Sequence, residues 1–299
     1  MLAGLTTTAG FGMDPWATET QTTGPNRQSD PFAAFADSRL SEATHLETDA
    51  VESVLADGED PNIASEGHQY PLHTAQNAQV VDLLLNAGAN PDVFDANGHT
   101  PLFKAMENLV NPYRRHRRNE YIEEAKLLLQ AGANPNLGDR QTGLTPLAIA
   151  LFEYSQNKNS ADIKEIVILL LEAGANPNEE DFVVEPVKYK APLLIKYLQD
   201  KDIVKMLLHA GANPNLDCRF TGTSPLAHAV LNNDIEAVGL LLEAGANYNT
   251  MIYGEIRDIE DLANKIGIYL NNFDIVRLIK EYKKGDDYDT SSSNACTLQ

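Results

Sequence analysis

The chain has 299 residues, of which 43% are hydrophobic and 22% are charged, so it can bury a substantial core. Its formal net charge of −20 argues against nucleic-acid binding, because that function needs a basic face to neutralise phosphates. The sequence also lacks the run of about 18 apolar residues that a transmembrane helix requires, and its start does not resemble a secretory signal.

The N-terminal part divides into a leader and the start of a helical region. Residues 1–30 are rich in Thr and Gly and predict a disordered leader. Helices are predicted throughout residues 31–284, starting with Phe32–Leu46 and a second helix and turn over Asp49–Asn62. This first pair lacks the start signal of later pairs, which is typical of a capping unit with a polar outer face.

One complete unit runs from residue 98 to residue 134. A threonine-proline pair at 100–101 is a good helix start. The threonine side chain can cap a free backbone N–H, and proline loses no hydrogen bond at the first helical position. A second helix over Tyr121–Gln130 has apolar residues at helical spacing. Gly132 is expected to end that helix in the left-handed conformation, and the following Asn-Pro prevents its continuation.

The same sequence motif recurs along the chain. Glycines of successive Ala-Gly-Ala-Asn-Pro copies and their variants are 30 to 44 residues apart, a period typical of stacked repeats. The copies are Ala87–Pro91, Ala131–Pro135, Ala173–Pro177 and Ala210–Pro214, with variants at Asp57–Pro61 and Ala244–Tyr248. Because no such unit buries its apolar face alone, we expect an array with one continuous core.

The openings of the units carry a resemblance to a known family. Tyr70-Pro-Leu-His-Thr-Ala, Thr100-Pro-Leu, Thr145-Pro-Leu and Ser224-Pro-Leu-Ala-His-Ala precede the first helices. With the period of the array, this pattern resembles the ankyrin repeat, whose signature is Thr-Pro-Leu-His-x-Ala. The resemblance implies an all-α ankyrin-type solenoid of about seven helix-turn-helix units with short inter-repeat turns.

Two adjacent units carry insertions between their helices, Glu107–Glu120 and Phe152–Asp162. We expect both to project opposite the inter-repeat turns and to form one ledge. The first insertion contains the basic residues Arg114, Arg115, Arg117 and Arg118. This run predicts a site for an anionic partner, and the alternative is a solvated loop whose arginines pair with neighbouring carboxylates.

The spacing of reactive side chains does not predict catalysis. His73 stands in the signature position, where the resemblance implies a structural role, and the histidines form no metal-ligand spacing. Cys218 is expected to be an unreactive surface or rim residue of a turn, far in sequence from the other cysteine. We therefore predict a cytoplasmic protein that is not an enzyme and uses no cofactor or metal.

The C-terminal end combines a final helix pair with a tail. Asp258–Ile268 and Asn272–Tyr282 predict that pair, and residues 285–299 are small and polar, which indicates a flexible tail. The last four residues, Cys296-Thr-Leu-Gln, resemble a prenylation box whose terminal glutamine directs farnesylation. We expect a farnesyl group on Cys296 to recruit the protein to membranes, and the alternative is an unmodified cysteine.

The resemblance implies that the chain, as a monomer, binds another protein through a concave face of turn tips and first helices. The family's contact positions fall on Asn97, His99, Lys104, Arg140, Gln141, Leu144, Phe182, Tyr189, Lys190, Arg219, Phe220, Thr223 and His228. The aromatic and arginine members are the expected hot spots.

The predicted function is therefore a non-enzymatic interaction scaffold. Alternatives are an adaptor or inhibitor that occludes one specific enzyme, and an enzyme whose catalytic residues lie in the insertions. The repeated Ala-Gly-Ala-Asn-Pro-Asn motif and the lone array of repeats also resemble effectors secreted by intracellular bacteria. This resemblance would place the protein in a host cell's cytosol or at its membranes.

Overall fold

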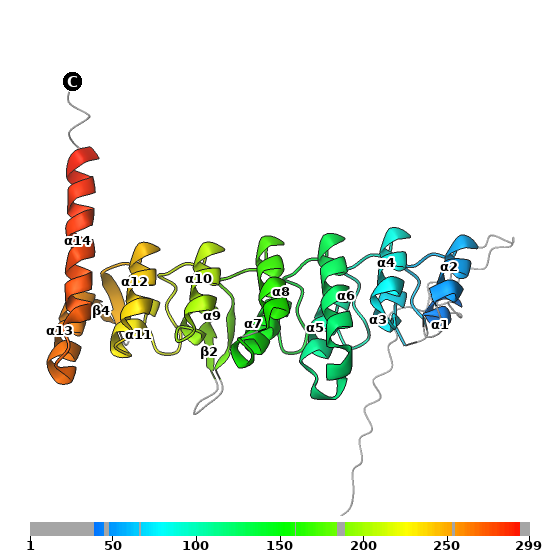
Figure 1. Cartoon of the computed structure of the whole chain (residues 1–299), viewed down its shortest axis with the longest axis horizontal. Coiled ribbons are helices and arrows are strands. Elements are labelled where there is room, and N and C mark those ends of the chain that lie inside the picture. Colours follow the sequence, from blue (N-terminus) through cyan, green and yellow to red (C-terminus); the bar gives the residue numbers. More distant parts are fainter. Residues whose placement is uncertain are drawn as a thin grey trace, which may run out of the picture. The chain divides into compact units, whose positions relative to one another are not determined.

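The computed structural model describes residues 39–44, 48–65, 67–158, 160–183, 189–252 and 255–293. In this part of the chain the helices follow one another as seven pairs (Figure 1). The pairs are α1 (Arg39–Ala43) with α2 (Thr48–Ala56), α3 (Pro71–Thr74) with α4 (Ala78–Asn86), α5 (Pro101–Val110) with α6 (Arg118–Gln130), α7 (Pro146–Gln156) with α8 (Ala161–Glu172), α9 (Leu193–Lys196) with α10 (Lys201–His209), α11 (Pro225–Leu231) with α12 (Ile235–Glu243), and α13 (Ile259–Leu270) with α14 (Asp274–Ser293). The predicted all-α solenoid is confirmed, and the predicted leader lies outside the described residues.

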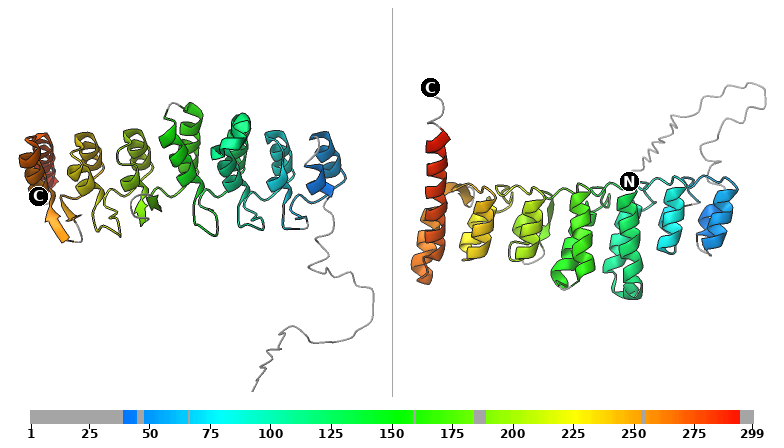
Figure 2. Two further views of the ribbon diagram at one scale, coloured as in Figure 1. Left: turned by 90° about the horizontal axis from the view of Figure 1, so that it is seen from below. Right: turned by 45° about the horizontal axis from the view of Figure 1, so that its top comes forward.

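Helices of the same kind pack into two layers. The second helices α4, α6 and α8 contact one another in order, as do α10, α12 and α14. The first helices α3, α5 and α7 form the other layer, in which α11 also contacts α13. The loops between pairs project to one side of the helices (Figure 2, left). These loops and the first-helix layer together make the surface on which the predicted contact positions lie.

Helix starts and stops follow the local sequence. Thr100 Oγ1 accepts a hydrogen bond at 3.2 Å from the backbone N–H three residues on, and Pro101 occupies the first turn of α5. Thr145 and Ser224 cap α7 and α11 in the same way. Gly132 follows α6 with a φ of 84°, a conformation that glycine adopts without steric cost. The start signal at 100–101 and the stop signal at Gly132, predicted for the unit at residues 98–134, are confirmed.

Asparagine side chains join several units to the next along the inter-repeat turns. Asn136 Oδ1 accepts from the backbone N–H of Asn176 at 2.8 Å, and its Nδ2 donates to the carbonyl oxygen of Gly174 at 2.9 Å. Asn62 and Asn215 make the same two bonds to the units that follow them. We call these contacts the asparagine ladder. They give a structural reason for the recurring Asn-Pro-Asn sequence.

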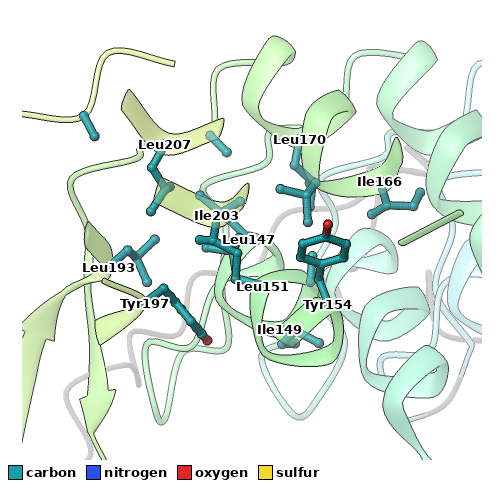
Figure 3. Packing of buried hydrophobic residues seen from close by; sticks show 14 of the residues in the cluster. Leu147, Ile149, Leu151, Tyr154, Ile166, Leu170, Leu193, Tyr197, Ile203 and Leu207 are labelled. Carbon is teal, nitrogen blue, oxygen red and sulfur yellow. The ribbon is translucent and has the colours of Figure 1, made fainter. Parts of the chain in front are cut away.

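The core is a continuous layer of apolar side chains between the two helix layers. In Figure 3, Leu147, Leu151 and Tyr154 of α7 lie beside Leu170 of α8 and Ile203 of α10. All of these residues are almost fully buried. Because each unit packs against its neighbours in this way, the burial that stabilises one unit depends on the next.

Two β-hairpins interrupt the helical pattern. β1 (Glu180–Val183) pairs antiparallel with β2 (Tyr189–Pro192), and β3 (Asn249–Ile252) with β4 (Glu255–Asp258). The all-α solenoid expected from the sequence contained no strands over residues 180–192. The valines and aromatic residues of that segment favour extended, paired backbone, which explains the difference.

The last helix is longer than predicted. α14 continues to Ser293, beyond the predicted end at Tyr282 and into the segment 285–299 that we expected to be flexible. An existing helix gains one hydrogen bond for each residue added, and a single glycine such as Gly285 opposes it by only about 1 kcal/mol. None of the described helices is long and apolar enough to span a bilayer.

Candidate partner-binding surface

The turn that opens the third unit is held by a buried carboxylate. Asp95 Oδ1 accepts from the backbone N–H groups of Asn97 and His99, each at 2.9 Å. Asn97 is exposed at the tip of this turn, whereas His99 is mostly buried. Lys104, from the first turn of α5, places its Nζ 3.9 Å from Asp95 Oδ2. The turn therefore has a fixed conformation, and Asn97 is the most accessible of the three predicted contact residues in this unit.

The turn of the fourth unit repeats this arrangement and stacks on the third. Asp139 Oδ1 accepts from the backbone N–H of Gln141 at 3.1 Å and lies 3.6 Å from His99 Nε2. A hydrogen bond from the Thr142 hydroxyl holds the pKa of Asp139 below its ordinary value, although burial opposes this. Arg140 places its guanidinium 3.7 Å from the centre of the Phe94 ring, a cation–π contact between neighbouring turns.

Gln141 is exposed, and its Nε2 donates to the carbonyl oxygen of Asn97 at 3.5 Å. Leu144 behaves differently, because it is half-buried and packs against the apolar core. The polar tips of the third and fourth turns therefore contact each other, while Leu144 belongs largely to the interior.

The turn of the sixth unit presents the most exposed members of the predicted set. Cys218 and Thr223 form an antiparallel bridge at its base, with a 3.0 Å hydrogen bond from the N–H of Cys218. At the tip, the Arg219 side chain is 85% exposed and Phe220 is 62% exposed. Arg219 Nε also lies 3.2 Å from Glu180 Oε1, at the start of β1.

Two expectations for this turn are wrong. Thr223 is 0% exposed, so it is not on the surface that a partner would touch, and Cys218 is also fully buried. The reason is the same for both residues. The bridge turns them inward and leaves the intervening Arg219 and Phe220 outside.

His73, in the signature position, and His228, on a later first helix, are both half-buried. His73 Nε2 is 3.0 Å from the carbonyl oxygen of His99, a contact that ties α3 to the next turn. Burial lowers the pKa of His73 and also that of His228, which favours the neutral ring at both positions. His73 thus has the structural contact that the resemblance implied. His228 lies on the first helix α11 and is only partly accessible.

The remaining predicted contact residues lie on the β1–β2 hairpin. Phe182 is paired with Lys190, and Val183 with Tyr189, in antiparallel register. The structure describes only the backbone at these positions. Glu180, at the base of this hairpin, is the ion-pair partner of Arg219 in the turn of the sixth unit.

The arginine run lies in a short 3-10 helix, η2 (Pro112–Arg117), and at the start of α6. Arg117 Nη2 lies 2.7 Å from Glu120 Oε2, and Arg118 Nη1 lies 2.8 Å from Glu153 Oε1 on α7. The Arg118 contact joins the two insertions, as the ledge prediction required. Two of the four arginines therefore pair with local carboxylates, as the alternative interpretation proposed. Among the described residues, Arg114 and Arg115 form no ion pair.

The described residues contain no group of three or more His, Cys, Asp or Glu side chains arranged to hold a metal ion. The lipidation candidate Cys296 lies outside the described residues, and its farnesylation stays a prediction. The asparagine ladder is a feature that the sequence analysis missed. The available signal was the asparagine that directly follows three of the Asn-Pro pairs, at Asn136, Asn178 and Asn215.

Comparisons with known proteins find ankyrin-repeat family models that match parts of this chain. A family model described as ankyrin repeats, three copies, matches residues 165–252, and a model of the single ankyrin repeat matches residues 68–96 and 142–182. No curated protein sequence matches the chain.

Several solved structures are similar. The ankyrin repeat domain of Bcl-3, described as a unique member of the IkappaB protein family, is 26% identical with a TM-score of 0.52, covering 81% of this chain and 99% of that one. An ankyrin repeat domain from Acinetobacter baumannii AYE is 24% identical with a TM-score of 0.50, covering 70% of this chain and 98% of that one. The human ASB11 ankyrin repeat domain is 23% identical with a TM-score of 0.44, covering 76% and 92%.

Proposed function

This chain is an ankyrin-repeat protein, and we propose that it acts as a non-enzymatic scaffold that binds another protein through its inter-repeat turns and first helices. Ankyrin repeats generally mediate protein–protein interactions. The observation that carries the proposal for this chain is the turn of the sixth unit, which exposes an arginine and a phenylalanine side by side on a bridged base.

Arg219 and Phe220 have the properties of binding hot spots. Arginine and aromatic side chains dominate the energy of many protein interfaces. Phe220 leaves 62% of its surface in water, so most of the ring is accessible to a partner. Burying that ring against a partner would remove apolar surface from water and stabilise the complex.

The rigidity of the turns also favours binding. The asparagine ladder and the buried carboxylates Asp95 and Asp139 fix the backbone of successive turns before any partner arrives. A surface that is already ordered avoids much of the entropic cost of association. Binding energy from each exposed side chain then contributes to affinity directly.

The experiment compares partner binding by three forms of the chain. The wild type is used to isolate a bound protein from cell lysate, and the affinity of the identified protein is then measured by calorimetry. Phe220→Ala is expected to weaken binding by at least about tenfold, since a hot spot contributes more than about 1.4 kcal/mol. Arg219→Glu is expected to weaken it as well, because it reverses the charge presented beside the ring.

The matched control is Tyr113→Ala. Tyr113 is also an exposed aromatic residue, at 90%, but it lies in η2 and away from the inter-repeat turns. Its removal should change the dissociation constant by less than about twofold. A partner that is lost with Tyr113→Ala and retained with Phe220→Ala would contradict the proposal.

A further inference from the structure

The second unit has a short first helix next to a unit with a long one, and a pocket lies between them. α3 (Pro71–Thr74) has 4 residues, whereas its neighbour α5 has 10 and continues into η2. In Figure 1, the α5–α6 pair reaches further down than α3 and α4. The pocket has a volume of about 430 Å³ and is lined by α3, its following loop, α5, η2 and α6. A helix of ordinary length in this unit would occupy some of that space.

The mouth and walls of the pocket are basic, in a chain whose net charge is −20. Lys104, Arg114, His116 and Arg117 all line it. Arg117 is held in place, since it pairs with Glu120 at 2.7 Å and its guanidinium lies 5.2 Å from the centre of a tyrosine ring. Arg114 donates to an asparagine oxygen at 2.7 Å and pairs with no carboxylate of the described chain, so most of its donors are available to a ligand.

A buried carboxyl group lies within the same pocket. The Glu124 side chain is 10% exposed, and its Oε1 has no hydrogen-bond partner in the described part of the chain. The nearest cationic atom is Arg117 Nη2, at 4.0 Å. Burial raises the pKa of Glu124 to about 7, although Arg117 opposes this. A buried polar atom without a partner lowers the stability of the fold. Glu124 Oε1 is therefore a hydrogen-bonding group of the pocket that a ligand can use.

We propose that this pocket binds a small phosphorylated polyol, with phosphate groups at Arg114, Lys104 and His116 and a hydroxyl group against Glu124. Several cationic side chains around one pocket can bind a ligand with several phosphate charges, and a carboxyl oxygen can accept a hydrogen bond from a hydroxyl group. The volume lies within the range of about 300–1,000 Å³ that small organic ligands occupy. This site does not depend on the proposed protein partner.

Calorimetry with D-myo-inositol 1,4,5-trisphosphate as the probe tests the proposal. The wild type should bind it with a dissociation constant below about 0.1 mM, which is usual for a built site with several charge-assisted bonds. Inorganic phosphate should bind at least about tenfold more weakly, because it cannot reach both the arginine and Glu124. Equal binding of the two probes would overturn the polyol assignment.

Two arginine variants distinguish this pocket from general electrostatic attraction. Arg114→Ala removes a lining cation and should weaken binding by about tenfold. Arg115→Ala removes the next residue, which carries the same charge but does not line the pocket, and should change binding by less than about twofold. Equal weakening by both variants would overturn the proposal.

A third variant fills the space itself. Ala75→Phe places a ring in the pocket from the residue that ends α3, and it should abolish binding. Circular dichroism and thermal unfolding confirm that each variant is folded. Retention of full affinity in folded Ala75→Phe would show that the probe binds elsewhere.

The phosphorylated group could come from a soluble molecule or from a lipid headgroup. Vesicles of about 95% phosphatidylcholine and about 5% phosphatidylinositol 4,5-bisphosphate distinguish these two sources. Sedimentation of the wild type, but not of Arg114→Ala, with these vesicles identifies a headgroup. Binding of the soluble probe without sedimentation identifies a soluble ligand. Failure to bind either probe below about 1 mM overturns the proposal, whatever the outcome of the protein-partner experiment.

Discussion

Glu124 shows how one residue can lower the stability of this fold. Its folded-state pKa of about 7 is above the ordinary value of 4.5, mainly because of burial. A raised carboxyl pKa means that the stabilising contribution of the protonated form is fully present below pH 4.5 and is lost as the pH rises through 7. The charged form at alkaline pH is therefore a source of instability.

Glu124→Gln is expected to raise the free energy of unfolding at pH 8 by about 2–3 kcal/mol and to change it little at pH 4.5. Glutamine has the same size but cannot ionise. Urea unfolding of both proteins at the two pH values measures this difference, and other titrating groups affect both proteins equally. An equal difference at the two pH values would show that ionisation of Glu124 is not the cause.

At the level of the repeat element, one junction of the asparagine ladder has an aspartate in place of the asparagine. Asp92 stands where other units have asparagine, and its Oδ1 accepts from the backbone N–H of Asn134 at 2.8 Å. A carboxylate cannot provide the second bond, in which Asn136 Nδ2 donates to the carbonyl oxygen of Gly174. The junction between the second and third turns therefore lacks one inter-unit hydrogen bond.

Asp92→Asn is expected to stabilise the protein by about 0.5–1 kcal/mol, because the new amide can donate to the carbonyl oxygen of Gly132. Differential scanning calorimetry should show a melting temperature higher by about 1–4 °C. The reverse substitution, Asn136→Asp, serves as the control and should lower it by a similar amount. A lower melting temperature for Asp92→Asn would contradict the bonding scheme.

Several elements could be predicted from sequence because their signals are local. The start of α5 at Pro101 and the turn at Gly132 depend on residues adjacent in the chain. The pocket beside α3 could not be predicted in this way, since it depends on a difference in length between two neighbouring helices. The inward position of Thr223 was also missed, because the bridge to Cys218 is formed by backbone groups that any residue possesses.

For the whole molecule, the stacking of units determines what kind of surface is available. The second helices pack in one layer, and the first helices with the turns form the other side. Exposed partner candidates such as Phe220 and Asn97 come from units far apart in sequence, yet their turns project to the same side. A partner that contacts several turns would combine modest contributions from each one.

The most direct test of the scaffold proposal is hydrogen–deuterium exchange of the chain with and without its isolated protein partner. We predict slower exchange in the complex at the turns 95–99, 139–144 and 218–223, with little change in α4, α6 and α8. Protection confined to those second helices, with the turns unchanged, would contradict the scaffold proposal.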